Sequence, residues 1–318
     1  MPARPRLLGL LAVAIVLTAC PSQAPTPSPA GPTQTPSPSP SISRSPGSAE
    51  PMPTAEDIAT LVAAGDIADC GRDADSMTGA LVAELDGTVA TLGDNVYPAG
   101  SDDRYATCYD EAWGAAIDRT RPSIGNHDLA EDGGAAYHRY FGEAAGEAGE
   151  GWYSYELGVW HVVVLNSNCQ FVGCAPRSAQ HDWLLADLAA SDAECTLAYW
   201  HHPRFSSGPH GDDPAVASFW EALDEADADL VLAGHEHQYE RFQPQAADGV
   251  TDPDGLRQIT VGTGGAALRP AVRVAPNSEL IIDDAFGVIV LTLRPGGYEW
   301  RLLAIDGAER DSGSASCQ

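Results

Sequence analysis

The chain has 318 residues, a formal net charge of −28 at pH 7 and 17 basic residues, all of them arginine. These arginines form no cluster along the sequence, which argues against general binding to nucleic acid or to an anionic membrane surface. Small ligands suit such an acidic surface better than long polyanions.

The N-terminus has the layout of a signal peptide. Arg4 and Arg6 precede an apolar run, Leu7–Thr18, that is too short to span a bilayer comfortably. The run leads to Ala19-Cys20, which resembles the lipobox of bacterial lipoproteins, whose cysteine becomes the lipidated N-terminus. We therefore expect residues 1–20 to be a lipoprotein signal peptide and the mature protein to be extracytoplasmic, touching the membrane only through lipidated Cys20. The alternative is an ordinary secretory signal, a secreted protein and an incidental Cys20.

The next segment, 21–56, consists mainly of Pro, Ser, Thr, Ala and Gly. It has almost no large apolar side chain, so it cannot bury enough surface to offset the entropy of ordering. We predict a disordered stalk at 21–56 and one catalytic domain with its own core at 57–318.

Six cysteines follow Cys20, and an even number in an exported protein predicts disulfides. Free buried thiols are the alternative. Cysteine spacing does not settle the connectivity, and only one of the pairs is close in sequence. The pairings that we choose are Cys169–Cys174, which closes a small loop, Cys70–Cys108 and Cys195–Cys317.

Short β-rich runs alternate with helical stretches along 57–318. We predict strands at Leu61–Ala64, Thr88–Leu92, Ser154–Leu165, Thr196–Trp200, Leu230–Ala233, Gln258–Val261 and Phe286–Leu293. We predict helices at Ala74–Leu85, Ser178–Ala190 and Ala215–Ala226. The last strand is expected to open a hairpin with its turn at Pro295-Gly296-Gly297. This alternation indicates an α/β domain with its site at the carboxyl ends of strands.

Side chains with metal-binding chemistry follow five strand-like runs. In chain order the motifs are Asp66 in LVAAGD, Asp94 and Tyr97 in LGDNVY, Gly-Asn-His-Asp at 125–128, His201 in LAYWHH and Gly-His-Glu-His at 234–237. Glycine before a ligand lets the backbone turn sharply and approach a metal closely. Two cations a few ångströms apart need about seven to eight donors, one of them bridging. The motifs together therefore predict a paired-metal hydrolytic centre.

The residue types within the motifs suggest separate tasks. Asn126 offers a neutral oxygen ligand, and the adjacent His127 can act on a substrate. His235 and His237 are two residues apart, on the same side of an extended strand end, where each can face a different metal. Asp94 is the natural bridge, because a carboxylate can share its charge between two cations.

The order Asp66, GDNVY, GNHD, HHP, GHEH resembles the calcineurin-like metallophosphoesterase superfamily over 57–305. The superfamily pattern begins Asp-x-His, but Asp66 is followed by Ile67-Ala68. Tyr97, three residues after Asp94, is instead the hallmark of the purple acid phosphatase branch. LGDNVYPAG resembles the small tartrate-resistant type, whereas AYWHHPRFSS and GHEHQYER resemble the larger plant type. The resemblance implies the α/β fold of the superfamily, a two-sheet β-sandwich flanked by helices.

The resemblance also implies a ligand set. Asp66, Asp94, Tyr97 and His237 would hold the first metal, ferric iron, and Asp94, Asn126, His201 and His235 would hold the second, Zn²⁺, Mn²⁺ or Fe²⁺. A hydroxide on the metals would attack phosphorus in line, with both cations neutralising the developing charge. His127 would lie beside the phosphate and donate to it or to the leaving oxygen. Hard phenolate and carboxylate donors suit a trivalent ion, and the histidine-rich half suits zinc or manganese.

Some residues near the motifs keep a second interpretation. His202 and His210 are candidate catalytic or substrate-binding groups, yet His202 can simply pack, and His210 lies in a variable Gly/Pro loop, Ser206–Asp212. Tyr97 can be a half-buried strand-end aromatic residue rather than a ligand. Glu236, between two histidines, is expected to point away from the metals.

These observations favour an extracytoplasmic dimetal phosphatase acting on small phosphate monoesters. A phosphodiesterase or nucleotidase with the same metal site is the first alternative, because pocket shape cannot be inferred from motif spacing. A displayed binding protein with a vestigial site is the second, although a degenerate site would be expected to lose ligands. The motifs do not indicate an oligomeric state.

Overall fold

The computed structural model describes residues 57–318, so the predicted signal peptide and stalk lie outside the described residues. Two β-sheets face each other. The first contains, in spatial order, β13 (Glu309–Ser316), β12 (Gly297–Ala304), β11 (Gly287–Arg294), β1 (Ala59–Ala64), β2 (Thr88–Leu92) and β3 (Thr120–Ser123). The second contains β10 (Ser278–Ile282), β8 (Tyr239–Phe242), β9 (Arg257–Val261), β7 (Leu230–Ala233), β6 (Cys195–Trp200), β5 (Trp160–Val164) and β4 (Tyr153–Leu157).

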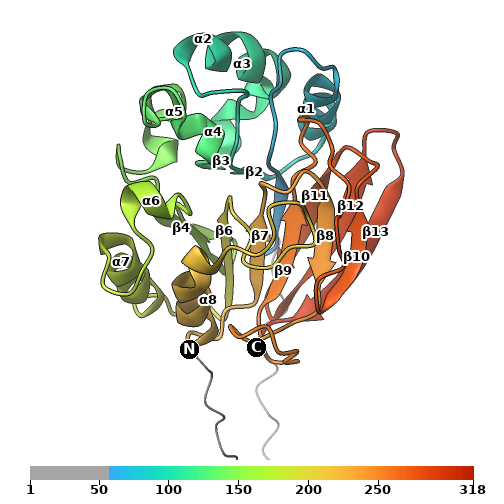
Figure 1. Cartoon of the computed structure of the whole chain (residues 1–318). Coiled ribbons are helices and arrows are strands. Elements are labelled where there is room, and N and C mark those ends of the chain that lie inside the picture. Colours follow the sequence, from blue (N-terminus) through green and yellow to red (C-terminus); the bar gives the residue numbers. More distant parts are fainter. Residues whose placement is uncertain (1–56) are drawn as a thin grey trace, which may run out of the picture. The chain divides into compact units, whose positions relative to one another are not determined.

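Helices flank this pair of sheets (Figure 1). The longer ones are α1 (Ala74–Glu84), α5 (Ala135–Phe141), α7 (Ala179–Leu188) and α8 (Ala217–Asp224). Shorter helical segments are α2 (Asp102–Arg104), η1 (Tyr105–Tyr109), α3 (Asp110–Ala112), η2 (Gly114–Arg119), α4 (Asn126–Leu129), η3 (Gly142–Ala145), α6 (Cys169–Val172) and η4 (Pro214–Val216). The expected α/β fold, a two-sheet β-sandwich flanked by helices, is confirmed.

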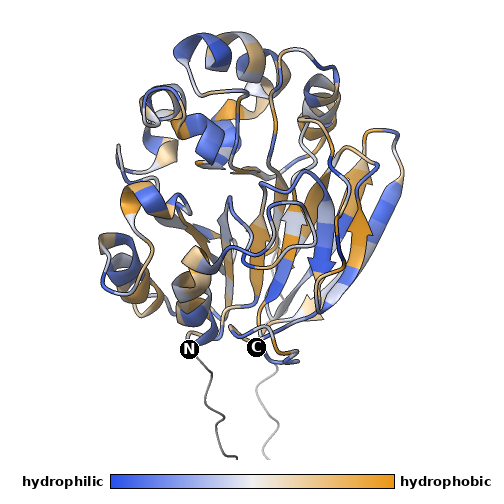
Figure 2. Ribbon diagram, in the orientation of Figure 1, coloured by the Kyte–Doolittle hydropathy of each residue, from blue (hydrophilic) through white to orange (hydrophobic). Residues whose placement is uncertain are grey.

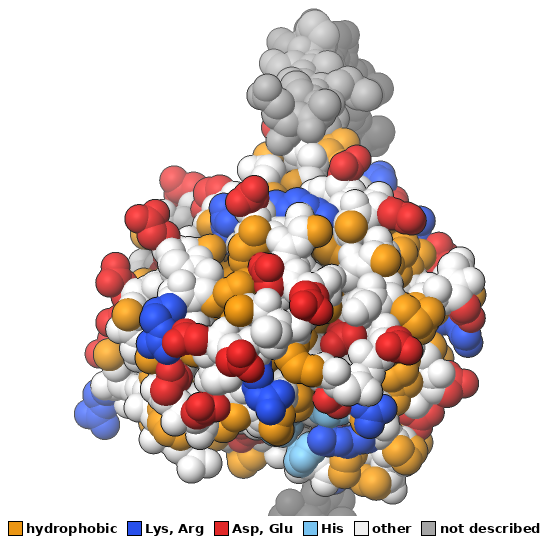
Figure 3. Space-filling view, turned by 90° about the horizontal axis from the view of Figure 1, so that it is seen from above, with side chains coloured by type: hydrophobic (Ala, Val, Ile, Leu, Met, Phe, Trp, Pro, Cys, Tyr) orange, Lys and Arg blue, Asp and Glu red, His pale blue; other side chains and the backbone are white. Residues whose placement is uncertain are grey.

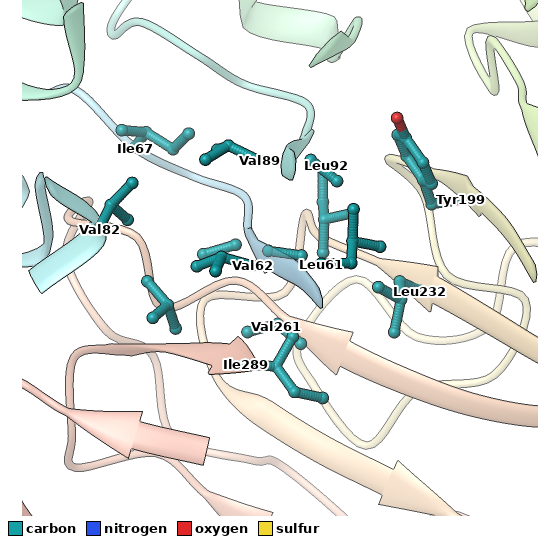
Figure 4. Packing of buried hydrophobic residues seen from close by; sticks show 14 of the residues in the cluster. Leu61, Val62, Ile67, Val82, Val89, Leu92, Tyr199, Leu232, Val261 and Ile289 are labelled. Atoms are coloured by element: carbon teal, nitrogen blue, oxygen red, sulfur yellow. The ribbon is translucent and has the colours of Figure 1, made fainter. Parts of the chain in front are cut away.

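The apolar strands of the second sheet are buried on both faces, which explains why they show no polar alternation. In β6, Leu197 and Tyr199 join the cluster between the two sheets, whereas Ala198 and Trp200 join a second cluster with helix α8. Successive side chains of a strand point to opposite faces, so one continuous apolar run serves two cores. Figure 4 shows the cluster between the sheets, with Leu61 of β1 close to Leu232 of β7, and Figure 2 shows the apolar strands as orange ribbons.

Most predicted elements are present, with some differences. The run Ser154–Leu165 forms two antiparallel strands, β4 and β5, because Gly158 turns the chain at a φ of 63°. The predicted hairpin is β11–β12, with Arg294 opposite Gly297 and Pro295-Gly296 at the turn. Strands β3, β8, β10 and β13 were not predicted. Strand β13 alternates between exposed and partly exposed residues, so it carries no apolar signal.

All three predicted disulfides are present, namely Cys70–Cys108, Cys169–Cys174 and Cys195–Cys317. Disulfides of this kind persist in oxidising compartments, which supports an extracytoplasmic location. Within residues 57–318, no helix combines the length and the apolar character needed to cross a membrane.

Candidate metal centre

The predicted ligands follow the carboxyl ends of parallel strands in both sheets. Strands β1, β2 and β3 run parallel in the first sheet, and β5, β6, β7 and β9 run parallel in the second. Asp66, Asp94 and Tyr97 lie in the loops after strands of the first sheet, and Asn126 begins helix α4 after β3. The loops after strands of the second sheet carry His201, His235 and His237. Backbone hydrogen bonds join the two sets, among them the Gly65 amide to the Val261 carbonyl. The two sheets therefore meet at one edge where all seven side chains lie.

The backbone at the ligands is held in an unusual conformation. Asp66, Asp94 and His235 have φ values of 60°, 50° and 69°, in the left-handed region that L-residues seldom occupy. Each such residue costs about 1–3 kcal/mol, and this strain concentrates at functional sites. Gly93, with φ of 82°, packs so closely that a Cβ there would lie 2.5 Å from Nδ1 of His201. The predicted need for glycine beside the ligands is confirmed at this position.

The carboxylates and the phenol of the first sheet converge on one point. The Tyr97 hydroxyl lies 2.7 Å from Oδ1 of Asp66, 2.9 Å from Oδ2 of Asp94 and 3.2 Å from Nε2 of His237. Nε2 of His237 is 3.3 Å from Oδ1 of Asp66. These four donors are close enough together to coordinate a single cation.

Two of the second sheet's histidines, His201 and His237, present Nε2 to the same region. Nδ1 of His201 contacts the Leu92 carbonyl at 2.8 Å, and Nδ1 of His237 contacts the Ala267 carbonyl at 2.7 Å. Donation of Nδ1–H to a backbone carbonyl leaves Nε2 with its lone pair free, the tautomer that a metal requires. Nε2 of His201 then lies 3.2 Å from Oδ1 of Asn126, from Oδ2 of Asp94 and from Nδ1 of His235.

Burial makes this collection of donors costly without a cation. The exposed fraction is 0% for Asp66 and 1% for Asp94, and within residues 57–318 neither carboxylate has an arginine partner. Burial, Asp66 and Asp94 raise the pKa of Tyr97 well above its ordinary value. A phenolate therefore needs a metal ion to form here. The donor types and their geometry fit a dimetal site.

Two overlapping groups of ligand atoms are compact enough to hold metal ions. Asp66, Asp94 and His201 offer one ligand atom each within 4.8 Å of one another, and so do His201, His202 and His235. His202 thus lies at the centre rather than away from it. Its Nδ1 contacts Oγ of Ser167 at 2.8 Å, and burial followed by the charge of His201 lowers the pKa of His202 to about 3.

His127 lies at the edge of the centre. Its backbone amide donates to Oδ1 of Asp94 at 2.8 Å, and its Nδ1 lies 2.6 Å from the Pro98 carbonyl. The ring packs against that of Tyr97, with 4.4 Å between ring centroids. Nε2 of His127 lies 3.9 Å from Oδ2 of Asp94, and one third of the side chain is exposed. This nitrogen therefore faces the open side of the centre.

His210 reaches the centre from the loop Ser206–Asp212. Its ring centroid lies 4.4 Å from that of His235, and 44% of its side chain is exposed. Glu236, which is 1% exposed, accepts hydrogen bonds from the amides of His210 and Gly211 and so points into this loop, as expected. Arg269 lies 3.4 Å from Nε2 of His210. Figure 3 shows histidine and arginine side chains side by side at one place on the upper face.

One buried residue of the GNHD motif was not assigned from the sequence. The Asp128 carboxylate accepts hydrogen bonds from the amides of Gly125 and Asn95 and from the hydroxyl of Tyr105. It thereby holds the loops that carry Asn126 and Asp94 together. Burial and then the charge of Asp94 raise the pKa of Asp128 to about 6. Its place in the motif was a signal, but two of its partners, Asn95 and Tyr105, lie too far away in the sequence to be recognised.

Comparisons with known proteins agree with this geometry. Residues 50–239 match the model of the calcineurin-like phosphoesterase family. The chain is 33% identical over 129 residues to purple acid phosphatase 18 of Arabidopsis thaliana, covering 39% of this chain and 29% of that protein. It is 34% identical over 146 residues to purple acid phosphatase 21 of the same plant, covering 43% and 32%. The matched part is thus about a third of the length of these relatives.

A solved structure extends the likeness to the fold. The purple acid phosphatase from yellow lupin (Lupinus luteus) seeds superposes with a TM-score of 0.71 at 18% identity, over 81% of this chain and 54% of that one. At this level of identity the likeness concerns the arrangement of sheets and helices alone.

Proposed function

Because this chain belongs to the calcineurin-like phosphoesterase family, we propose that it is an extracytoplasmic dimetal phosphatase that hydrolyses small phosphate monoesters. The observation that carries the proposal is the convergence of seven metal-type donors from both sheets, with two histidines locked in the tautomer that presents Nε2 inward. The plant purple acid phosphatases named above support the choice of branch.

The ligand atoms divide between two metal positions. The proposed ferric site lies at the Tyr97 hydroxyl, where the side chains of Asp66, Asp94 and His237 gather around it. The proposed site for Zn²⁺, Mn²⁺ or Fe²⁺ lies at Nε2 of His201, where the side chains of Asp94, Asn126 and His235 gather around it. Asp94 belongs to both sets, as a bridging carboxylate should. When bound, the two ions would supply an activated nucleophile and neutralise the phosphate charge.

The remaining histidines would act on the substrate. Nδ1 of His127 faces the Pro98 carbonyl and would donate its proton to it, so Nε2 would donate to the phosphate or to the leaving oxygen only when both ring nitrogens carry a proton. His210, whose ring lies beside that of His235 and is partly exposed, would contact the ester from its loop. His202 is held by Ser167 and packs against His235, and it would line the substrate site.

The test is a pair of substrates with one control variant. Initial rates on an aryl phosphate monoester and on the matched diester are measured for the metal-loaded protein and for Asp94→Ala. We expect monoester turnover that Asp94→Ala abolishes, because this substitution removes a ligand from both positions. A strong diester preference would instead indicate the phosphodiesterase or nucleotidase. No turnover of either ester with metals bound would favour a displayed binding protein.

The location of the enzyme is a separate part of the proposal. The three disulfides fit an oxidising compartment. Residues 1–20 would direct export, and lipidated Cys20 would anchor the protein at the end of the stalk 21–56. Mass spectrometry of the mature N-terminus tests this, and an unmodified N-terminal residue would rule out the lipid anchor.

A further inference from the structure

A pocket of about 200 Å³ opens directly beside the candidate metal centre. Asn126 and His202 form the wall that it shares with the centre, and Asn168, Phe171, Asp213 and Ala215 are among the residues that complete it. A molecule bound to the metals through a phosphate group would therefore extend its other end into this space. In size the pocket suits one substituted ring, since a cavity of about 150 Å³ accepts benzene.

Two residues that line the pocket, Ser167 and Asn168, are hydrogen-bonded to the segments that carry the candidate ligands. The buried side chain of Asn168 donates to the Ile124 carbonyl at 3.1 Å, two residues before Asn126. Oγ of Ser167 accepts from the backbone amide of His202 at 2.9 Å. The segment that begins at Ser167 thus keeps a fixed position relative to the metal ligands, as a preformed subsite requires.

Phe171 stands at the rim of this pocket on a rigid turn. It belongs to the one-turn helix α6 (Cys169–Val172), which the disulfide Cys169–Cys174 closes. The Phe171 amide donates to the Asn168 carbonyl at 2.9 Å, which links the turn to another residue of the pocket lining. Phe171 is nevertheless 68% exposed, and among the large apolar residues exposed in 57–318 it is the only aromatic one. An exposed ring on a disulfide-closed turn, in the lining of a pocket that Asn126 and His202 also line, can serve as a stacking platform.

The charges around the pocket restrict what can bind. No arginine lines it, and its one ionisable carboxylate is that of Asp213, whose Oδ1 accepts the Ala215 amide. A second phosphate or a carboxylate on the substrate would find no cationic partner there and would be repelled by Asp213. A neutral apolar group meets no such penalty.

We propose that this pocket is the subsite for the leaving group of the phosphate ester and that it selects a single neutral aromatic ring, which packs on Phe171. The proposal rests on the proposed function, since it names the substrate class of the same centre. It assigns Phe171 as a specificity-determining residue, and it predicts discrimination against nucleoside di- and triphosphates and against esters that carry a second anionic group.

The experiment separates binding from turnover. Calorimetry gives the affinities of the metal-loaded protein for benzylphosphonate and ethylphosphonate, which cannot be hydrolysed. Kinetics give kcat/KM for benzyl phosphate and ethyl phosphate, whose leaving alcohols have nearly the same acidity. We expect the benzyl-over-ethyl preference to fall about two- to tenfold in Phe171→Ala, mainly through KM. Phe171→Tyr should keep the preference, and Leu185→Ala, an exposed apolar residue on α7, should leave it unchanged.

The outcomes distinguish the two proposals. A benzyl-over-ethyl preference that Phe171→Ala leaves unchanged, or its absence in the unaltered protein, overturns the leaving-group subsite even if both esters are hydrolysed. If neither ester is hydrolysed but benzylphosphonate binding depends on Phe171, the aromatic subsite stands and the proposed phosphatase activity fails. Because Phe171 is exposed, its replacement is not expected to impair folding, and the melting temperature of each variant checks this.

Discussion

Replacement of Gly125 by alanine tests how closely the metal centre depends on backbone packing. Gly125 precedes Asn126, and its φ of −100° and ψ of 179° are ordinary for alanine, so the substitution introduces no backbone strain. A Cβ at this position would nevertheless lie 2.1 Å from the amide nitrogen and 2.2 Å from Oδ1 of Asp94. The added methyl group would therefore push the Gly125 backbone and Asp94 apart.

The size of the effect follows from these distances. Real Cβ atoms essentially never approach another heavy atom more closely than 3.0 Å, so Asp94 or the Gly125 backbone must move by roughly 1 Å. A misplacement of about 1 Å in a catalytic group typically costs about 100-fold in rate. Overpacking of this kind also costs about 1–3 kcal/mol of folding free energy. We expect Gly125→Ala to fold, to lose most of its bound metal and to lose about 100-fold in kcat/KM.

The assay combines metal content, kcat/KM on an aryl phosphate and the free energy of unfolding. Gly71→Ala is the matched control, because Gly71 has an ordinary φ and the nearest atom to its Cβ would be Oδ1 of Asp69, at 3.9 Å. This variant should behave as the unaltered protein does. If Gly125→Ala retained full metal content and a kcat/KM within about twofold of the unaltered protein, the proposed coupling between Gly125 and Asp94 would be refuted.

Three further predictions concern the proposed iron ligand Tyr97, a buried histidine and a disulfide. Tyr97→Phe should abolish the visible charge-transfer absorption expected of the iron-loaded protein, and an unchanged spectrum would exclude Tyr97 as the iron ligand. Nε2 of His161 lies 2.8 Å from Oδ2 of Asp187, and its Nδ1 lies 2.8 Å from Oε1 of Glu156. The hydrogen bond to Asp187, and to a lesser extent the one to Glu156, raises the pKa of His161 although burial lowers it. Asp187→Asn should therefore cost about 1.5–3 kcal/mol below pH 6.5. This loss of unfolding free energy should shrink as the pH rises through the raised pKa of His161. Denaturant titrations at several pH values measure it, and a loss that stays constant with pH would contradict the prediction. Serine at both Cys195 and Cys317 removes a crosslink between residues 122 positions apart and should lower the free energy of unfolding by about 5 kcal/mol. An unchanged denaturation midpoint would show that the disulfide does not stabilise the fold by reducing the entropy of the unfolded chain.

The candidate metal ligands could be proposed from the sequence because each of them belongs to a short local motif. Asp66 and Asp94 follow apolar strands through a single glycine, and that pattern depends on neighbouring residues alone. Strand β13 could not be predicted, because its residues are largely exposed and it forms by antiparallel pairing with β12. The position of Phe171 was equally inaccessible, since the contacts that bring it beside Asn126 come from a loop some 40 residues away.

The same limit applies to the residues that support the centre. Glu236 was expected to point away from the metals, yet its partners, the amides of His210 and Gly211, lie in a loop 25 residues earlier. Asp128 likewise acts on Asn95, 33 positions before it. Contacts at such separations depend on tertiary packing, which local patterns of apolarity and turn residues do not encode.

The division of the ligands between the two sheets has a thermodynamic consequence. Four of the candidate ligands follow strands of the first sheet and three follow strands of the second, so ions bound between them would act as a crosslink that only the folded chain can form. A ligand present at about 1,000 times its Kd stabilises a native state by about 4 kcal/mol. Metal supply would then govern how long the sandwich stays folded, and a chelator would lower the free energy of unfolding, with the first loss of contact between the sheets at the edge that holds the candidate ligands.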